Sequence, residues 1–196
     1  MDESMGGVAR RDVLKSGAGL VAGLLAARAA GGAWMQDGGV KNEASGKAGD
    51  FDFLAGEWKI KHRRLKAAHG TEWDEFEGEA TCWTILGGVG SVEELRIPSR
   101  KFAGMGLRLL DVEKKVWNDF WVNAKSGVLT TPGQTGLFEG GVGTFTADDT
   151  DAEGKAIKVK GVWDRITPKS CRWWQAVSWD GGKTWEENWF MDWTKV

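Results

Sequence analysis

The chain has 196 residues with 26 basic and 28 acidic side chains, a net charge of -2. Nucleic-acid binding needs a clustered basic excess, so this balance argues against nucleic acid as a partner. Two cysteines, Cys82 and Cys171, are too few for a disulfide scaffold or a zinc site. We expect two buried free thiols, with a single disulfide as the alternative. The 13 Trp, 8 Phe and 29 Gly, with only 3 Pro, are typical of aromatic-rich strands joined by tight turns.

The first thirty residues predict an export signal. Arg10 and Arg11 lie in a segment that resembles the twin-arginine motif, and a Gly/Ala-rich apolar run follows from Ser16 to Ala27. This run is too short to span a bilayer, so we expect cleavage near Ala29 and no stable membrane insertion of the mature chain. The expected location is periplasmic or secreted. Residues 31–50 predict a flexible linker, and residues 51–196 one barrel domain.

The segment 56–65 predicts a strand whose two faces differ. Period-two alternation places Trp58, Ile60, His62 and Arg64 on one face, which changes from apolar to ionisable along its length. A second strand at about 73–86 has glutamates at alternate positions, so one hairpin register satisfies both faces. In that register the outward pairs are Arg63 with Glu75, Lys61 with Glu77, and Lys59 with Glu79.

Further strands follow at short intervals, each joined to the next by a hairpin-length turn. The strands at 102–110 and 116–123 are predicted to pair across Asp111–Lys115. That pairing directs Met105, Leu107 and Leu109 inward, beside Trp121, Asp119 and Trp117. The remaining strands are expected at about 89–97, 136–139, 142–146, 157–165, 171–179 and 185–193, with Trp163 against Trp173 inside and Asp164 against Arg172 outside.

An open meander of about ten short strands would leave the backbone groups of its two edge strands unpaired. Closing into a barrel pairs them. The predicted fold is therefore all-β, a single antiparallel up-and-down β-barrel of about 8–10 strands, lipocalin- or calycin-like. A barrel of this size encloses a ligand-sized interior. Six tryptophans fall on its predicted inner face: Trp58, Trp117, Trp121, Trp163, Trp173 and Trp189.

Four motifs, taken in order, resemble a bacterial family of unknown function whose members are assigned a lipocalin-like, calycin-type barrel. The resemblance covers about residues 51 to 194 and implies the fold, without a substrate or catalytic residues. The motifs are Phe51-Asp-Phe-x-x-Gly-x-Trp58, His62-Arg-Arg-Leu65, Leu86-Gly-Gly-x-Gly90 with its following acidic pair, and Asp180-Gly-Gly-Lys-Thr-Trp185.

His62 and Arg64 are the main candidates for chemistry, because they are inward neighbours on one strand. Arg64 suits an anionic ligand, and His62 suits a proton donor or acceptor. The alternative is a structural network in which Arg64 pairs with Glu93 or Glu94 and His62 bonds to Asp119 or Asn123. One of the two glutamates must point inward, and the sequence does not decide which.

We propose His62 as a catalytic candidate, and further inward polar groups are expected at Gln175, Glu187 and Arg165. The candidate ligand-binding residues are Arg64, Glu94, Trp121, Trp163, Gln175 and Trp189.

Cofactor chemistry has little support in the sequence. Only His62 and His69 exist, His69 has no second ligand at metal spacing, and we expect neither haem nor a metal. Asp180 is interpreted as the cap of a Gly-Gly turn with Trp185 packed beneath it.

Three functions stay open. The first is an exported barrel that binds a small, mostly apolar molecule, aromatic or anionic, in a Trp-lined cavity. The second is a cofactor-free isomerase, cyclase or lyase that uses His62 with an inward carboxylate. The third is a packed barrel that binds no ligand.

Overall fold

The computed structural model describes residues 45–196, which form a closed barrel of ten antiparallel strands. Each strand pairs with its neighbours in sequence, and β1 closes the barrel against β10, so the predicted fold class is confirmed. The strands are β1 (Gly56–Leu65), β2 (Trp73–Ile85), β3 (Gly90–Ile97), β4 (Phe102–Asp111), β5 (Val116–Asn123), β6 (Gln134–Glu139), β7 (Val142–Thr150), β8 (Ala156–Asp164), β9 (Ser170–Ser178) and β10 (Glu186–Lys195).

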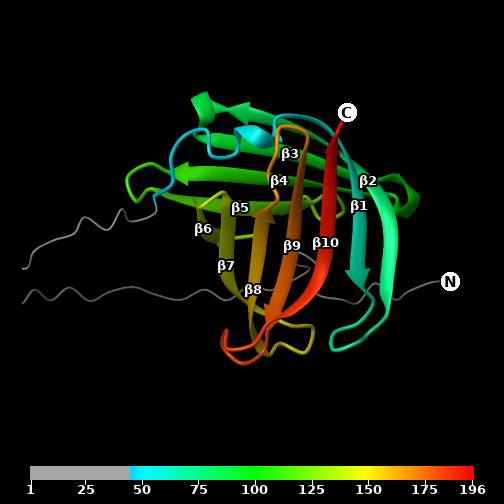
Figure 1. Cartoon of the computed structure of the whole chain (residues 1–196). Helices are drawn as coiled ribbons and strands as arrows, with labels where there is room; N and C mark the ends of the chain where they lie inside the picture. The colour runs from blue at the N-terminus through cyan, green and yellow to red at the C-terminus, as the bar shows by residue number, and fades with distance from the viewer. Residues whose placement is uncertain (1–44) are drawn as a thin grey trace, which may run out of the picture.

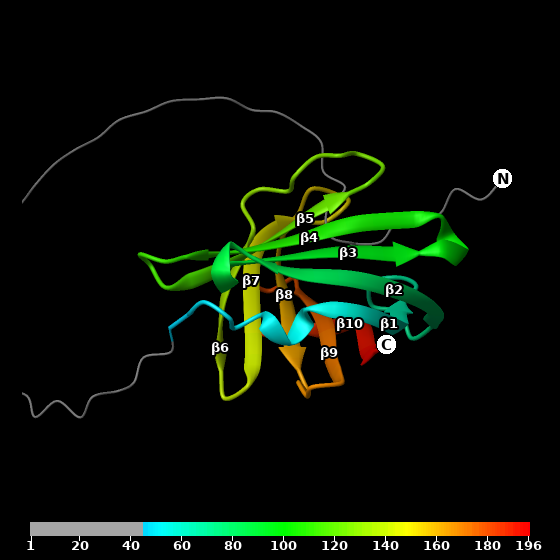
Figure 2. The ribbon, with the colours of Figure 1, turned by 90° about the horizontal axis from the view of Figure 1, so that it is seen from above.

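The two ends of the barrel differ. In Figure 1 the 3-10 helix η1 (Asp52–Leu54) lies at the upper end, and the β1–β2 and β9–β10 loops lie at the lower end. Seen from above, β2 to β5 run side by side and cross the direction of β7 and β8 (Figure 2). We call the end near η1 the closed end and the opposite end the open end. The remaining short helices are η2 (Leu86–Gly88) and η3 (Pro98–Arg100).

The closed end is filled by aromatic side chains. Phe51, at the start of η1, is 2% exposed, and its ring lies 4.9 Å from those of Trp117 and Phe138. Trp58 enters the core from β1 and donates its indole N–H to the Leu54 carbonyl oxygen at 2.7 Å. A buried indole needs such an acceptor, and η1 supplies it. This helical turn therefore acts as the plug of the barrel.

The β1–β2 hairpin has the predicted register, with Arg63 opposite Glu75 and Lys61 opposite Glu77. Two of the outward charges, however, have other contacts. Arg63 lies over the rings of Trp73 and Phe190, at 4.6 and 4.8 Å from their centroids. Glu79 binds Arg96 at 3.0 Å. The opposed charges fit the predicted register. Arg63 and Glu79 also contact side chains of the neighbouring strands, Phe190 of β10 and Arg96 of β3.

The predicted register of β4 with β5 is wrong by one residue. Arg108 pairs with Asp119, so Arg108 points inward and Leu107 lies on the outer face, together with Met105 and Leu109. The turn explains the slip, because Lys115 adopts a left-handed conformation (φ 54°) inside it and Asp111 pairs with Val116 instead of Lys115. A slip of one residue exchanges the two faces of a strand.

The predicted signal in residues 1–30 and most of the predicted linker lie outside the described residues. The last part of that linker packs on the closed end. Gly46 N–H donates to the Lys115 carbonyl oxygen at 2.7 Å, and Trp117 donates its indole N–H to Asp50 at 3.0 Å. The domain thus includes residues before 51. Within residues 45–196, no helix has the length and apolar character to cross a membrane.

Candidate functional site

His62 lies at the centre of the candidate site. It points inward from β1 and is 2% exposed. Its ring stacks on Phe76 of β2, with centroids 4.6 Å apart and planes 8° apart. Gly78, two residues further along β2, leaves room for it, since a Cβ there would lie 2.6 Å from His62 Nε2. The strand pairing and one missing side chain thus determine where the imidazole lies.

The hydrogen bonds of His62 define its tautomer. Trp189 donates its indole N–H to His62 Nδ1 at 3.2 Å. Nδ1 therefore accepts, and the proton of the neutral ring is on Nε2. Among residues 45–196, Nε2 has no hydrogen-bond partner. Buried polar atoms are normally paired, so an unpaired donor of this kind is a candidate contact for a ligand or water.

The ring of His62 is neutral at ordinary pH. Burial, followed by the positive charges of Arg100 and Arg64, lowers its pKa from 6.5 to about 3. A base with a pKa near 3 accepts protons poorly at neutral pH. The imidazole is thus suited to donating a hydrogen bond through Nε2.

Two guanidinium groups flank this neutral ring. Arg64 lies over Trp189, with its Cζ atom 4.8 Å from the ring centroid, and Arg100 lies over Phe76 at 3.6 Å. Asp74 binds Arg100 at 2.6 Å and is the cross-strand partner of Arg64. Burial, followed by the charge of Arg100, lowers the pKa of Arg64.

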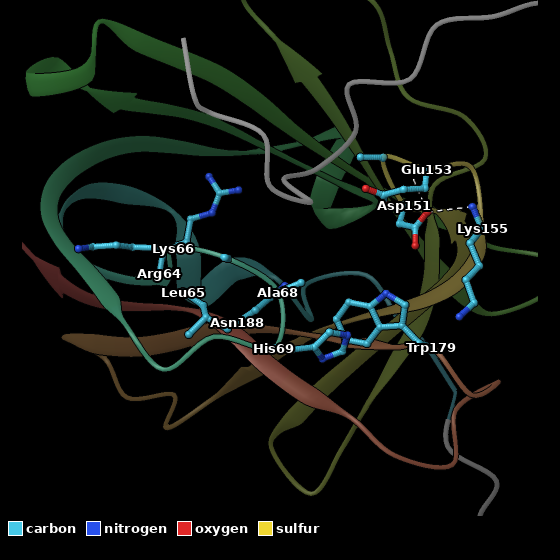
Figure 3. Close-up of a pocket in the computed structure, with 12 residues that line it drawn as sticks. Arg64, Leu65, Lys66, Ala68, His69, Asp151, Glu153, Lys155, Trp179 and Asn188 are labelled. Atoms are coloured by element: carbon cyan, nitrogen blue, oxygen red, sulfur yellow. Dashed lines mark hydrogen bonds between the residues drawn. The ribbon is translucent and has the colours of Figure 1, made fainter. Parts of the chain in front are cut away.

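A pocket of about 650 Å³ opens at this end of the barrel, and Arg64 is part of its lining (Figure 3). Its wall comes from the β1–β2 and β7–β8 loops and from residues beside β9 and β10. On one side His69 packs on Trp179 with ring centroids 4.3 Å apart. On the other, Asp151 shapes its loop by accepting the Lys155 backbone N–H at 2.8 Å. The volume suits a small-molecule ligand.

A second polar group lies inside the barrel, near the closed end. The sequence predicted an inward Asp119 and one inward glutamate, but it did not reveal Arg108. Arg108 is 0% exposed and forms an ion pair with Glu93, which is 1% exposed. The Nε atom of Arg108 lies 3.7 Å from an oxygen of Asp119. The Arg108 guanidinium also lies 5.2 Å from the Trp163 ring centroid. Burial lowers the pKa of Arg108, but the two carboxylates outweigh it and the net pKa is raised.

Glu93 is therefore the inward glutamate, and the prediction that placed Glu94 among ligand-binding residues of the interior is wrong. Glu94 lies on the exposed outer face and binds Arg96 at 2.9 Å. The alternative pairing of Arg64 with either glutamate also fails, since Glu93 pairs with Arg108. The expected hydrogen bond between His62 and Asp119 or Asn123 is also wrong: His62 accepts a hydrogen bond from the Trp189 indole N–H instead.

Two further inward predictions are wrong. Glu187 is exposed, because the pairing of β10 with β9 shifts register between Glu187 and Trp189. Arg165 lies just beyond the end of β8, exposed and with a positive φ of 51°. A β-bulge or a strand end breaks the alternation on which such predictions depend.

The other predicted residues do lie inside. Gln175 is 1% exposed and donates to the Asn188 side chain at 3.1 Å, close to the open end. Trp121 stacks with Phe102 over Gly104, where a side chain would overlap the indole. Trp189 belongs to the His62 cluster. Trp163 packs in the closed end, its ring 5.8 Å from Phe53, so these residues belong to two separate regions.

The remaining candidates are structural. Cys82 and Cys171 are free and buried, and burial followed by the charge of Glu93 raises the pKa of both thiols. Asp180 accepts the backbone N–H groups of Lys183 and Thr184 at 2.9 Å each, as a turn cap does. In residues 45–196 no group of three or more His, Cys, Asp or Glu side chains is placed to hold a metal ion.

Comparison with known proteins gives no information on the function of the site. No family model matches the chain, and no curated protein matches its sequence. The crystal structure of Rv2717c from M. tuberculosis is similar, at 11% sequence identity and a TM-score of 0.46, over 74% of this chain and 93% of that one. The chemistry of the site is therefore inferred from its own side chains.

Proposed function

We propose that this chain is an exported barrel that binds a small anionic molecule with an aromatic or apolar body at its open end. The observation that carries the proposal is the His62 Nε2–H donor, buried, without a partner in residues 45–196, and flanked by two arginines. A ligand acceptor at this point would satisfy a donor whose burial otherwise costs about 1–3 kcal/mol.

The charge of the cluster favours an anion. Arg64 and Arg100 bring two positive charges to this end of the barrel, and both act on His62. An anionic group near Arg64 gains a charge-assisted hydrogen bond in a partly desolvated place, where such bonds are stronger than in water. Trp179, which packs on His69 in the wall of the pocket, supplies aromatic surface for the body of the ligand.

Binding is better supported than catalysis. The enzyme hypothesis needs an inward carboxylate that is free to act beside His62, but Asp74 is bound to Arg100, and Glu93 lies at the level of Cys82, six residues along β2 from Phe76. This is about 20 Å along the strand at about 3.3 Å per residue. The neutral state of His62 adds to the difficulty, because general acid or base catalysis works best when the pKa lies near the working pH.

A fluorescent aromatic sulfonate, 1-anilinonaphthalene-8-sulfonate, tests the proposal. We expect Arg64→Gln to weaken its binding about tenfold, corresponding to the loss of about 1.4 kcal/mol from one charge-assisted contact. The neutral analogue N-phenyl-1-naphthylamine should lose little, since it has no anionic group. Fluorescence titration of both probes against the same protein measures the two dissociation constants.

Arg63→Gln is the matched control. Arg63 is the next residue of β1 but points to the outer face, over Trp73 and Phe190. The control should bind the sulfonate as the unmodified protein does. Equal loss in Arg63→Gln and Arg64→Gln, or equal preference for the charged and neutral probes, would contradict an anion site at Arg64.

A further inference from the structure

The β1–β2 loop forms one wall of the open-end pocket. Residues 66–72 are exposed along their whole length, and residues 65–69 line the pocket beside Arg64. Arg64 itself is fixed by the sheet, because it pairs with Trp189 of β10 on one side and with Asp74 of β2 on the other. The loop has left the sheet, since β1 ends at residue 65. The pocket therefore has a rigid part that carries Arg64 and a wall that no strand pairing holds.

One residue of this loop, His69, ties it to another part of the barrel. Its backbone N–H donates to both carboxylate oxygens of Glu186, at 3.0 and 3.1 Å, and its Nδ1 atom lies 3.1 Å from Oε2 of the same carboxylate. Glu186 is the first residue of β10, far away in the chain. The His69 ring also packs on Trp179, with ring centroids 4.3 Å apart (Figure 3). We call these contacts of His69 with Glu186 and Trp179 the His69 clasp.

The clasp is what attaches this loop to the barrel. Within residues 45–196, the other hydrogen bonds of the loop are internal to it: Lys66 N–H donates to the Glu72 carbonyl oxygen, and Gly70 N–H to that of Ala67. The ion pair of Lys66 with Glu72 is internal as well. None of residues 66–72 is buried, so no side chain of the loop is anchored in the core. A segment with so few buried contacts opens at a low cost in free energy.

The backbone of His69 favours release once the clasp is broken. Its φ angle is 59°, in the left-handed region. That region is uncommon for residues other than glycine, although histidine adopts it more often than most. A backbone in this conformation persists where its surroundings hold it, and here the Glu186 carboxylate and the Trp179 ring do so. Loss of these two contacts removes what keeps the loop in this conformation.

We infer that the β1–β2 loop is a lid on the open-end pocket, and that the His69 clasp holds this lid closed. The inference rests on the proposed function in one respect, that the pocket takes a ligand. Asp151 and Glu153 of the β7–β8 loop lie on another wall of the pocket (Figure 3). Breaking the hydrogen bonds to the Glu186 carboxylate, which is itself part-exposed, lets the loop move away while every strand keeps its pairing. Access to Arg64 is then set by how often the lid opens.

Chemical labelling of Arg64 in the full chain tests the lid without any assumption about the ligand. Phenylglyoxal modifies arginine side chains, and peptide fragmentation in a mass spectrometer gives the labelling rate of each arginine separately. We expect Glu186→Ala to raise the rate at Arg64 about tenfold, because the clasp loses its hydrogen-bond acceptor. Amide hydrogen exchange of residues 66–72 should become faster as well. Arg63, exposed on the outer face of the same strand, should be labelled at an unchanged rate.

Glu72→Ala is the matched control. It removes the ion pair with Lys66 inside the same loop but leaves the clasp intact, so the labelling rate of Arg64 should not change. His69→Asn is a second variant at an exposed position. Asparagine also adopts the left-handed conformation and keeps the backbone N–H, but it loses the ring contact with Trp179. The rate at Arg64 should therefore rise in His69→Asn, though less than in Glu186→Ala.

Three results would overturn the lid. The first is a rate at Arg64, or an exchange of residues 66–72, that Glu186→Ala leaves unchanged. The second is an equal rise in Glu72→Ala, and the third is a rise at Arg63 that matches the one at Arg64, which would indicate a loosened barrel. The sulfonate titration of Arg64→Gln tests the anion site separately, so that the lid and the proposed ligand can fail independently.

Discussion

Replacing Arg108 by methionine is expected to lower the free energy of unfolding by about 3–5 kcal/mol, as the removal of one partner from a buried ion pair does. Arg108 is 0% exposed and contacts both Glu93 and Asp119. Methionine fills a similar volume but leaves two carboxylates in an aromatic core without their counter-charge. Urea unfolding followed by tryptophan fluorescence measures the loss.

Two variants make this result specific. Arg96→Met removes an arginine with two ion pairs on the outer face, to Glu79 and Glu94, and should cost less than about 1 kcal/mol. The double variant Arg108→Met, Glu93→Gln should regain part of the stability, because one uncompensated charge is gone. If Arg108→Met and Arg96→Met cost the same, the buried pair does not hold the closed end together.

Acidification is expected to destabilise the protein through His62. The folded-state pKa of His62 is about 3 against 6.5 for an ordinary histidine. Between these values the unfolded chain binds a proton that the folded chain excludes. The contribution of His62 to stability is thus fully present above pH 6.5 and declines as the pH falls towards 3. Its slope is at most about 1.4 kcal/mol per pH unit.

His62→Asn isolates this contribution. Its amide oxygen can accept the Trp189 indole N–H in place of Nδ1, but it does not titrate. The unmodified protein should lose stability faster than His62→Asn as the pH falls from 6.5 to 4, measured by urea unfolding at each pH. Parallel curves, or an imidazole that titrates near pH 6.5 by NMR, would show that His62 is not buried in its neutral form.

The outward apolar side chains of β4 and the missed arginine have the same origin. Met105, Leu107 and Leu109 alternate as an inward-facing strand does, and this pattern predicts that they line the interior. The structure places them outside and leaves Arg108, with the small residue Gly104, on the inside. Where both faces of a strand carry apolar side chains, alternation cannot tell inside from outside. The turn that includes Lys115 decides it.

The sequence alone predicted a closed meander of about 8–10 strands and the β1–β2 register. It could do so because turn residues separate the strands, and because charges on one face of that hairpin and apolar groups on the other agree on a single alignment. It also placed His62 and Trp189 on the inner face.

Only the tertiary structure decided which carboxylates enter the barrel and what surrounds His62. Three features depend on strands and loops that are far apart in the chain. Glu93 points inward, Glu187 points outward at a register shift, and Arg100 stacks on Phe76. The period-two pattern of a strand predicts two faces. Which face is inner, and which side chains meet across the barrel, follows from closure and from the exact length of each turn.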